Sequence, residues 1–275
     1  MLNFLIDENL CTQCGACRDD CIARIIQLDG ANPFILLEDE AKCYHCLHCL
    51  AICPTGALSI DGVKPDDCSP LAGNLPSPGT MATLIRGRRS VRQYAQEDLP
   101  ATVIHELLQT AWQAPTGVNS RQVRFTVLDT QKQMHAFRDE VMVELAELVR
   151  TNRLAERFEM VAKFVQVWQE SKLDIIFRDA PHLVVASAPK SIPTPVPDCL
   201  IALTNFDLYA QSSQIGTVWA GFVYLILQEL LPHLRNKLEI PEDHLIGYAI
   251  LFGKPAVQYE RTVIHQNPII HRPVW

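Results

Sequence analysis

Apolar positions in the first sixty residues come in short runs, separated by turn-forming pairs such as Asp29-Gly30 and Asn32-Pro33. Short apolar runs bounded by Gly, Pro, Asn and Asp are typical of β-strands joined by tight turns. We therefore predict a small unit of two similar halves, each built from a strand, a loop, a short helix and a second strand. The predicted strands are residues 3–6, 24–28, 34–38 and 57–60.

Beyond residue 80 the apolar residues recur with the period of a helix over longer stretches. Asp98 and Pro100 predict an N-cap and a first-turn proline for the helix that follows them. Residues 131–172 predict two helical stretches that are broken near Thr151-Asn152. One face of the helix after Pro100 carries Val103, Ile104, Leu107, Leu108 and Ala111.

Strands are predicted between these helices, at residues 123–128, 183–188 and 246–252. Residues 199–231 predict two largely apolar helices that meet around Gly216. Helices packed on a sheet of few strands make an α+β domain. The sequence contains no G-x-G-x-x-G motif, so a Rossmann site for a dinucleotide is not supported.

Residues 61–79 separate the two patterns. Proline and glycine are concentrated there, for example at Pro65, Pro70 and Gly73, which is typical of a linker. The sequence thus predicts a small domain at 1–60, a linker at 61–79 and a larger α+β domain at 80–275.

Two cysteine runs with the same spacing, C-x-x-C-x-x-C-x-x-x-C, dominate the small domain. This spacing is that of two [4Fe–4S] ligand sets, in which the last cysteine of each run ligates the other cluster. The predicted ligands of the first cluster are Cys11, Cys14, Cys17 and Cys53. The predicted ligands of the second cluster are Cys43, Cys46, Cys49 and Cys21.

Structural zinc is the main alternative, because zinc sites also use paired C-x-x-C motifs. Zinc needs four ligands per site and does not require a third cysteine step within a run, so the clusters are favoured. A disulfide framework is less favoured still, because the thiols are crowded and no secretory signal precedes them.

Charge and composition bear on nucleic-acid binding, membrane insertion and cellular location. The formal net charge is −7, which gives no electrostatic footprint for nucleic acid. The longest apolar run, about residues 218–227, is shorter than a membrane span, so we expect no membrane insertion. Oxygen-sensitive clusters and unpaired thiols fit a reducing cytoplasm, which is the expected location.

Residues 86–94 form a second constellation and read Arg-Gly-Arg-Arg-Ser-Val-Arg-Gln-Tyr. Guanidinium groups bind phosphate oxygens bidentately, and a hydroxyl adds a further hydrogen bond. The stretch therefore suits a dianionic phosphate. On charge alone, a solvated basic helix end is the alternative.

The small domain resembles the bacterial two-cluster ferredoxins, although Ile22 stands where the first run usually carries proline. Roughly residues 80–275 resemble the nitroreductase family of flavoproteins, which binds FMN. That family opens with an R-R-S-x-R-type motif that holds the phosphate and ribityl chain of FMN. The matching residues here are Arg88, Arg89, Ser90 and Arg92.

Three further motifs carry the nitroreductase resemblance. The family's Ala-Pro-Ser/Thr, followed three residues later by Asn at the polar edge of the flavin ring, is matched by Ala114, Pro115, Thr116 and Asn119. A motif that runs from Asp198 to Gly221 and includes Ile215-Gly216-Thr217 implies that Gly216 and Thr217 lie near the flavin ring. The C-terminal motif, which begins at Gly247-Tyr248 and ends in Tyr259-Glu260-Arg261, implies that Arg261 returns to the FMN phosphate. The family's usual Gln-Pro-Trp is replaced by Arg121-Gln122-Val123.

These resemblances imply an FMN-dependent oxidoreductase that is a homodimer with FMN between its subunits. We expect a low-potential donor, such as a reduced ferredoxin, to load two [4Fe–4S] clusters, which pass electrons to FMN. Reduced FMN then transfers hydride to a small, electron-poor acceptor such as a nitroaromatic or a quinone. The flavin itself carries the chemistry, so no catalytic side chain is assigned.

Two other functions stay open at this point. The first alternative is an electron carrier that relays charge to a protein partner. The second alternative is an enzyme that carries out a different flavin reaction on the same scaffold, such as reductive dehalogenation or flavin fragmentation. A pyridine-nucleotide donor is a further alternative to ferredoxin.

Overall fold

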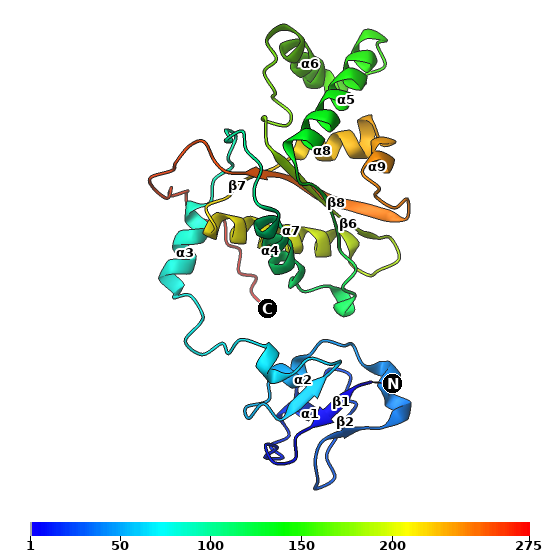
Figure 1. The fold of residues 1–275 in the computed structure, drawn as a ribbon, viewed down its shortest axis with the longest axis vertical. Coiled ribbons are helices and arrows are strands. Elements are labelled where there is room, and N and C mark those ends of the chain that lie inside the picture. Colours follow the sequence, from blue (N-terminus) through cyan, green and yellow to red (C-terminus); the bar gives the residue numbers. More distant parts are fainter. Residues whose placement is uncertain (1) are drawn as a thin grey trace. The chain divides into compact units, whose positions relative to one another are not determined.

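The computed structural model describes residues 2–275, and the chain divides into two compact units, Met1–Pro76 and Ser77–Trp275 (Figure 1). The stretch predicted as a linker holds a single-turn 3-10 helix, Pro65–Asp67, and the start of helix α3 (Pro78–Gly87). Ser77 caps α3, because its hydroxyl oxygen accepts the N–H of Thr80 at 3.1 Å.

The first unit is closed by its first and last strands. Strand β1 (Phe4–Ile6) pairs antiparallel with β4 (Leu58–Ile60), as the two outer apolar runs predict. Strand β2 (Ile26–Gln27) pairs antiparallel with β3 (Phe34–Ile35). The predicted strand at 34–38 is shorter than expected, because a 3-10 helix at Leu37–Lys42 follows β3 almost directly.

The two halves of this unit repeat the same backbone conformation, which confirms the predicted pseudo-repeat. Each half has a one-turn helix, α1 (Ala16–Asp19) or α2 (His48–Ala51). Three residues of the first half have a left-handed backbone conformation: Gln13, Gly15 and Arg24, with φ of 55°, 76° and 54°. The residues 32 positions later in the second half have the same conformation: His45, Leu47 and Gly56, with φ of 52°, 60° and 67°.

A four-stranded antiparallel sheet forms the centre of the second unit. Its strands are β5 (Arg124–Leu128), β6 (His182–Pro189), β8 (His244–Gly253) and β7 (Gly216–Trp219), in that spatial order. The predicted strands at 123–128, 183–188 and 246–252 are confirmed as β5, β6 and β8.

Helices cover both faces of this sheet, as the arrangement in Figure 1 shows. Helices α4 (Ala101–Trp112) and α7 (Pro195–Ser212) pack on one face, and alternate residues of β6, such as Val184 and Ala186, join their core. Leu183 of β6 points into the other core, which holds helices α5 (Gln131–Arg150) and α6 (Glu159–Ser171), a short helix α8 (Gly221–Leu225) and α9 (Leu234–Lys237). Because β6 is buried on both faces, its sequence is a continuous apolar run rather than an alternation of apolar and polar residues.

The two predicted helical stretches in 131–172 are confirmed as α5 and α6. Helix α5 begins with a capping box, in which the side chains of Thr130 and Gln133 each accept the other's backbone N–H. The break predicted near Thr151-Asn152 spans the residues between the two helices and includes the 3-10 turn Glu156–Phe158.

The prediction that two helices meet around Gly216 is wrong. Gly216 begins strand β7, which pairs with β8 from Gly216 opposite Gly253 to Trp219 opposite Ile250. Helix α8 starts only at Gly221 and continues as a π-helical turn at Ile226–Leu230. A short apolar run suits a helix or a strand equally by its pattern, and here the pairing with β8 decides between them.

The predicted cap of α4 is also wrong. Pro100 is the N-cap residue, and α4 begins at Ala101. Asp98 instead accepts the N–H of Gln131, the first residue of α5, at 2.7 Å. Asp98 therefore caps a helix that is distant in sequence. Across residues 2–275, no helix is both long and apolar enough to cross a membrane.

Candidate functional site

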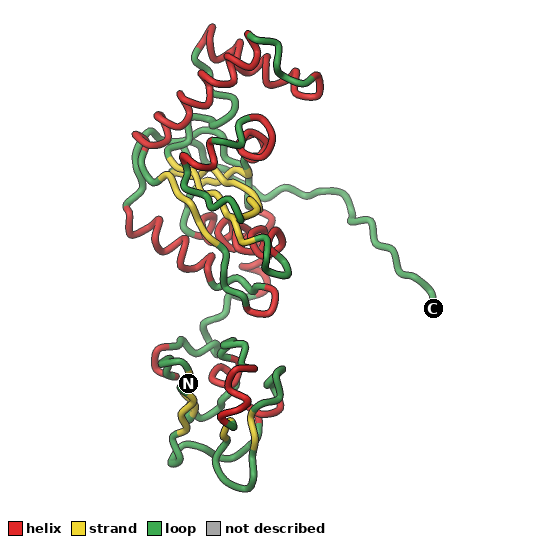
Figure 2. The backbone as a smooth tube through the Cα atoms, turned by 90° about the vertical axis from the view of Figure 1, so that its right-hand side faces the viewer, coloured by secondary structure: helices red, strands yellow, loops and turns green. Residues whose placement is uncertain are grey.

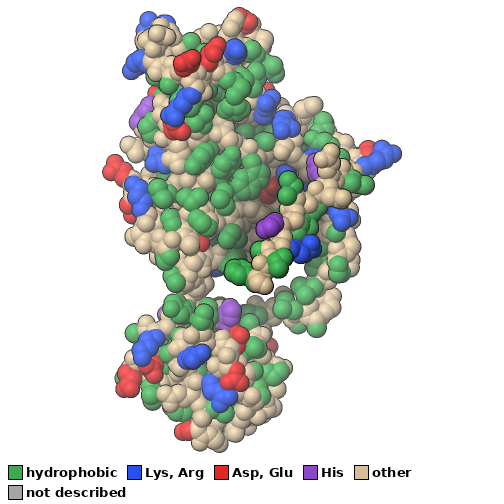
Figure 3. Space-filling model, turned by 180° about the vertical axis from the view of Figure 1, so that it is seen from behind, with side chains coloured by type: hydrophobic (Ala, Val, Ile, Leu, Met, Phe, Trp, Pro, Cys, Tyr) green, Lys and Arg blue, Asp and Glu red, His purple; other side chains and the backbone are tan. Residues whose placement is uncertain are grey.

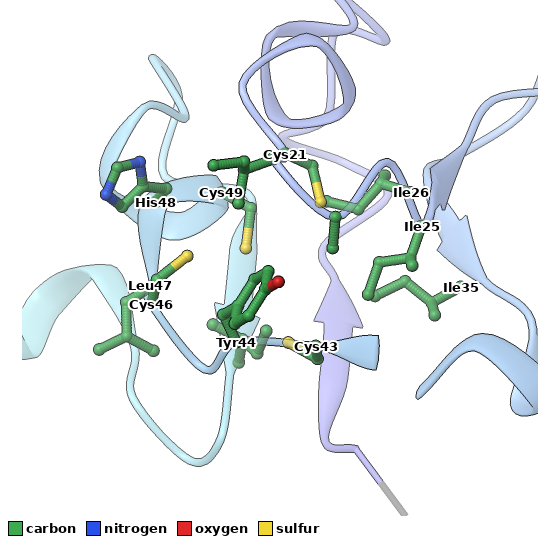
Figure 4. Close-up of a pocket in the computed structure, with 13 residues that line it drawn as sticks. Cys21, Ile25, Ile26, Ile35, Cys43, Tyr44, Cys46, Leu47, His48 and Cys49 are labelled. Carbon is green, nitrogen blue, oxygen red and sulfur yellow. The ribbon is translucent and has the colours of Figure 1, made fainter. Parts of the chain in front are cut away.

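The eight predicted cluster ligands divide between two pockets of the first unit. The first pocket, which Gly15 also lines, holds Cys11, Cys14, Cys17 and Cys53. The second pocket, which Tyr44 and Leu47 also line, holds Cys21, Cys43, Cys46 and Cys49. The sulfur atoms of these last four cysteines face a common space in Figure 4.

The one-turn helices explain why the last cysteine of each run reaches the other pocket. Cys21 lies two residues beyond the end of α1, and Cys53 lies two residues beyond the end of α2. Each helix therefore carries the chain away from the loop that holds the first three cysteines of its run. In the described part of the chain, no three His, Cys, Asp or Glu side chains are placed to hold a single metal ion.

Burial and backbone dipoles shape the electrostatics of these thiols. Burial raises the pKa of Cys49 to about 12 and also raises the pKa of Cys17 and Cys43. Burial acts in the same direction on Cys53, but the N–H of Ala57, 3.2 Å from its sulfur, and neighbouring donors lower the pKa of Cys53 overall. N–H groups that point at sulfur stabilise the anionic charge of a thiolate-ligated cluster. The two four-cysteine pockets therefore fit [4Fe–4S] clusters.

Two histidines next to the ligands have carboxylate partners of their own. The Nδ1 of His45 lies 2.7 Å from Asp61, and the Nδ1 of His48 lies 3.2 Å from Asp20. In Figure 4 the ring of His48 points away from the space between the sulfur atoms. Both histidines are thus placed as surface residues beside complete cysteine sets.

The arginine-rich stretch, residues 86–94, begins in the last turn of α3 and meets strand β7. Ser90 pairs with Thr217 in a parallel bridge, and the N–H of Val91 donates to the carbonyl of Thr217 at 2.8 Å. Gly216 permits this approach, because a Cβ there would lie 2.8 Å from the side chain of Val91. Two motifs that are distant in sequence are therefore brought side by side.

Two guanidinium nitrogens in this stretch are buried without an acceptor in the described part of the chain. The Nε of Arg88 lies 3.4 Å from Asp207, and an Nη of Arg89 donates to the carbonyl of Arg86 at 2.6 Å. Arg92 folds back onto the carbonyl two residues before it, at 3.4 Å. In the described part of the chain, Nη1 of Arg88 and Nε of Arg89 are buried and have no hydrogen-bond partner. Because an unsatisfied buried donor is costly, this stretch fits a bound anion such as phosphate.

The segment that contains Arg261 passes over the same stretch. The hydroxyl of Tyr259 donates to the carbonyl of Ser90 at 3.5 Å. A Cβ on Gly87 would lie 3.9 Å from the methyl group of Thr262. Arg261 lies between these two contacts and is exposed. The structure thus brings the C-terminal motif next to the arginine-rich stretch.

The loop between α4 and β5 is held by a buried carboxylate. Asp198, which is 2% exposed, accepts the N–H of Gly117 at 3.0 Å and the hydroxyl of Thr194 at 2.8 Å through the same oxygen. Gly117 is required here, because a Cβ would lie 2.0 Å from the hydroxyl oxygen of Thr194. Three predicted FMN contacts lie in this loop: Pro115, Thr116 and Asn119.

Arg121, which departs from the family pattern, stabilises the same loop. Its guanidinium lies 5.2 Å from the ring centroid of Trp112 and donates to the carbonyl of Ala114 at 3.0 Å. The backbone N–H of Arg121 donates to the hydroxyl of Thr116 at 3.0 Å. The side chain is therefore engaged in holding the loop rather than extended into solvent.

The two groups of predicted FMN contacts lie at different positions along α7. The loop at 115–119 is attached to Asp198 in the first turn of α7, and the arginine-rich stretch is attached to Asp207. Nine residues of helix correspond to roughly 14 Å. Within one copy of the chain, the two groups are therefore attached well apart.

Sequence reasoning did not identify Asp207 as part of the site. The residue stands in the apolar helix predicted from residue 199 onward, where a carboxylate has no reason to be buried unless it is paired. An aspartate between the apolar residues Phe206 and Leu208 was thus the available signal.

Comparison with known proteins gives the family. Residues 85–254 match the family model described as "Nitroreductase family", and residues 10–58 match a "4Fe-4S dicluster domain". The chain belongs to the nitroreductase family. It therefore joins a nitroreductase domain to an N-terminal 4Fe-4S dicluster domain, and the predicted α+β fold class is confirmed.

Relatives match both parts of this nitroreductase-family chain. A protein of Methanothermobacter thermautotrophicus, named "Putative NADH dehydrogenase/NAD(P)H nitroreductase", is 26% identical over 196 residues, which cover 70% of this chain and 85% of that protein. An uncharacterized ferredoxin of Methanocaldococcus jannaschii is 32% identical over 65 residues, which cover 23% of this chain and 84% of that protein.

A solved structure shares the fold of the second unit. The nitroreductase with bound FMN from Bacteroides fragilis has a TM-score of 0.54 and is 21% identical, with 69% of this chain and 97% of that chain covered. The family assignment makes the chain an FMN-dependent oxidoreductase, and the dicluster domain adds two [4Fe–4S] clusters as cofactors.

Proposed function

We propose that the chain takes electrons from a low-potential carrier such as a reduced ferredoxin and reduces a small, electron-poor acceptor. A nitroaromatic or a quinone is the expected kind of acceptor. The observation that carries this proposal is the union, in one chain, of two four-cysteine pockets and a nitroreductase domain. A cluster domain adds one-electron carriers that a reductase fed directly by a two-electron donor does not need.

The cofactors supply complementary chemistry when bound: clusters move single electrons, and FMN exchanges electrons singly or in pairs. The proposed cluster ligands are the four cysteines of each pocket. Backbone donors such as the N–H groups of His45 and Ala57, 3.4 Å and 3.2 Å from cysteine sulfurs, would stabilise the charge of the clusters.

The proposed FMN site uses the residues that the motifs indicate. Arg88, Arg89, Arg92 and Arg261 would neutralise the phosphate, and the hydroxyl of Ser90 would add a hydrogen bond. Gly216 and Thr217 on β7 would lie beside the flavin. The loop held by Asp198 would present Pro115, Thr116 and Asn119 to the ring, where the amide of Asn119 can both donate and accept.

The donor can be tested directly, because the cluster domain predicts a preference. The relative from M. thermautotrophicus carries NADH and NAD(P)H in its name. For this chain we expect reduced ferredoxin to reduce the flavin at least tenfold faster than NADH or NADPH, and to support steady reduction of a nitroaromatic. Anaerobic measurement of flavin absorbance with each donor makes the comparison. Equal rates with NADH, unaffected by loss of the clusters, would contradict the proposed entry of electrons.

We further propose that the protein is a homodimer that completes the FMN site from two copies. The C-terminal arm, defined as residues 263–275, supports this arrangement, because it leaves the body as an extended segment in Figure 2. Four of its apolar side chains are almost fully exposed: Ile264, Ile269, Val274 and Trp275.

An arm with this composition needs a surface to cover it. Hydrophobic side chains reach the surface over a wide area of the second unit on the face drawn in Figure 3. A second copy of the chain would offer the same surface to the arm of its partner, which is the isologous arrangement that two-fold dimers use.

Removal of the C-terminal arm should therefore weaken the dimer. We expect a chain ending at Thr262 to sediment mostly as a monomer at micromolar concentration and to retain less FMN, while its iron content stays unchanged. Replacement of Ile264, Ile269 and Val274 by serine in the full-length chain should have the same effect. Analytical ultracentrifugation distinguishes the species, and a truncated chain that stays fully dimeric would contradict the role of the arm.

A further inference from the structure

Asp207 is a buried carboxylate on the core-facing side of α7. The side chain is 3% exposed, and its neighbours on the helix, Phe206 and Ala210, belong to the core. Burial of an ionised carboxylate is costly unless the group is paired and hydrogen-bonded. The partners of Asp207 should therefore show what the residue is for.

In the described part of the chain, these partners lie on β7 and in the arginine-rich stretch. The hydroxyl of Thr217 donates to one carboxylate oxygen, and the indole N–H of Trp219 donates to the other at 2.9 Å. The Nε of Arg88 lies 3.4 Å from the second oxygen. Thr217 is also the bridge partner of Ser90, so the carboxylate connects α7, β7 and the arginine-rich stretch.

The pairing with Asp207 orients the guanidinium of Arg88. Because the group is planar and rigid, a contact through Nε on one edge leaves the terminal nitrogens for a second acceptor. Nη1 of Arg88 is buried and has no acceptor in the described part of the chain, and the same is true of Nε of Arg89. Two arginines that directly precede Ser90 in the chain therefore carry unsatisfied buried donors.

We propose that Asp207 is the positioning residue of the phosphate site: it holds Arg88 so that its terminal nitrogens meet the phosphate of FMN. The proposal rests on the FMN site described under the proposed function. It makes Asp207 the source of selectivity for the phosphorylated flavin, because riboflavin has no phosphate for Arg88 to contact.

The sign of the effect separates positioning from simple charge. A carboxylate near a phosphate repels it, so removal of the charge alone would strengthen the binding of FMN. Loss of the positioning contact would weaken it, because Arg88 would lose the orientation that its hydrogen bonds to phosphate require. Asp207→Asn keeps the shape of the side chain and removes its charge, so the two accounts predict opposite results.

The experiment compares FMN with riboflavin on the purified full-length chain stripped of flavin, by equilibrium dialysis under anaerobic conditions. In Asp207→Asn we expect FMN to bind on the order of 10-fold more weakly and riboflavin to bind within about twofold of wild type. Trp219→Phe is the matched control, because it removes one partner of the same carboxylate and leaves Arg88 in place. This control should keep the wild-type ratio of the two affinities.

A second variant approaches the contact from the other side. Arg88→Lys keeps the positive charge but cannot contact Asp207 and the phosphate through separate edges of one planar group. It should show the same selective loss of FMN, and Asp207→Asn should add little to it in the double variant, because both changes remove one unit. Arg88→Lys provides the test if Asp207→Asn does not fold.

The outcomes are distinct. A folded Asp207→Asn chain that binds FMN as tightly as wild type, or more tightly, would overturn the proposal, and so would an equal loss of FMN and riboflavin. An Arg88→Lys chain with wild-type selectivity would overturn it as well. A wild-type chain that binds neither flavin would instead overturn the proposed FMN site.

Discussion

Replacement of both Cys14 and Cys53 by serine should remove about half of the total iron, which is no more than either single replacement removes. Serine at both Cys14 and Cys21 should remove nearly all of it. The reason is that Cys14 and Cys53 line one pocket, whereas Cys21 lines the other, although Cys21 belongs to the same run as Cys14. The paired variants thus test which cysteines share a cluster rather than merely whether clusters are present.

Iron and acid-labile sulfide, determined per flavin-binding chain after anaerobic purification, measure this effect. Cys68→Ser is the matched control, because Cys68 is exposed and directly follows the 3-10 turn at 65–67, apart from both four-cysteine sets. It should keep the full iron content. If serine at Cys14 and Cys21 removed only half of the iron, each run would hold its own cluster, and the exchange of the last cysteines would be wrong.

Arg88→Ala should have the largest effect on the flavin. It removes a guanidinium from the phosphate site and leaves the buried carboxylate of Asp207 without its cationic partner. Loss of a hydrogen bond to a charged group costs about 1.5–3 kcal/mol, so the dissociation constant of FMN should rise roughly 10- to 150-fold. The protein should be purified largely without flavin, and its iron content should be unchanged because the clusters lie in the other unit.

Flavin content after gel filtration and a titration with added FMN check this expectation. Arg150→Ala is a suitable control, because Arg150 is an exposed arginine at the end of α5 that pairs with Glu147. It should bind FMN like the wild type. Retention of a full complement of FMN by Arg88→Ala would contradict the assignment of the arginine-rich stretch to the phosphate.

The features that the sequence predicts well are those with a local cause. The cysteine spacing is itself the geometry of a cluster loop, and the left-handed residues that shape the loop recur with it, as at Gln13 and His45. The buried strand β6 could be predicted because both of its faces meet helices, so its apolar run is continuous. Helices α5 and α6 could be predicted because each buries one face at the helical period.

The features that the sequence does not predict depend on distant partners. Whether residues 216–219 form a helix or a strand is decided by pairing with β8, which follows some thirty residues later. The role of Asp98 is decided by the start of α5, and that of Asp207 by Arg88 and Trp219. Each of these is a polar or backbone contact between elements, and such contacts leave no periodic trace in the chain.

One rapid-mixing measurement tests the proposed path of electrons through both units most directly. The holoenzyme, with FMN and both clusters, is mixed anaerobically with reduced ferredoxin, and cluster and flavin absorbance are followed before and after a nitroaromatic is added. We predict that the clusters bleach first, that the flavin follows, and that the nitroaromatic then reoxidises the flavin over many cycles. A flavin that is reduced equally fast in a Cys46→Ser chain, or that stays reduced in the presence of the nitroaromatic, would contradict the account.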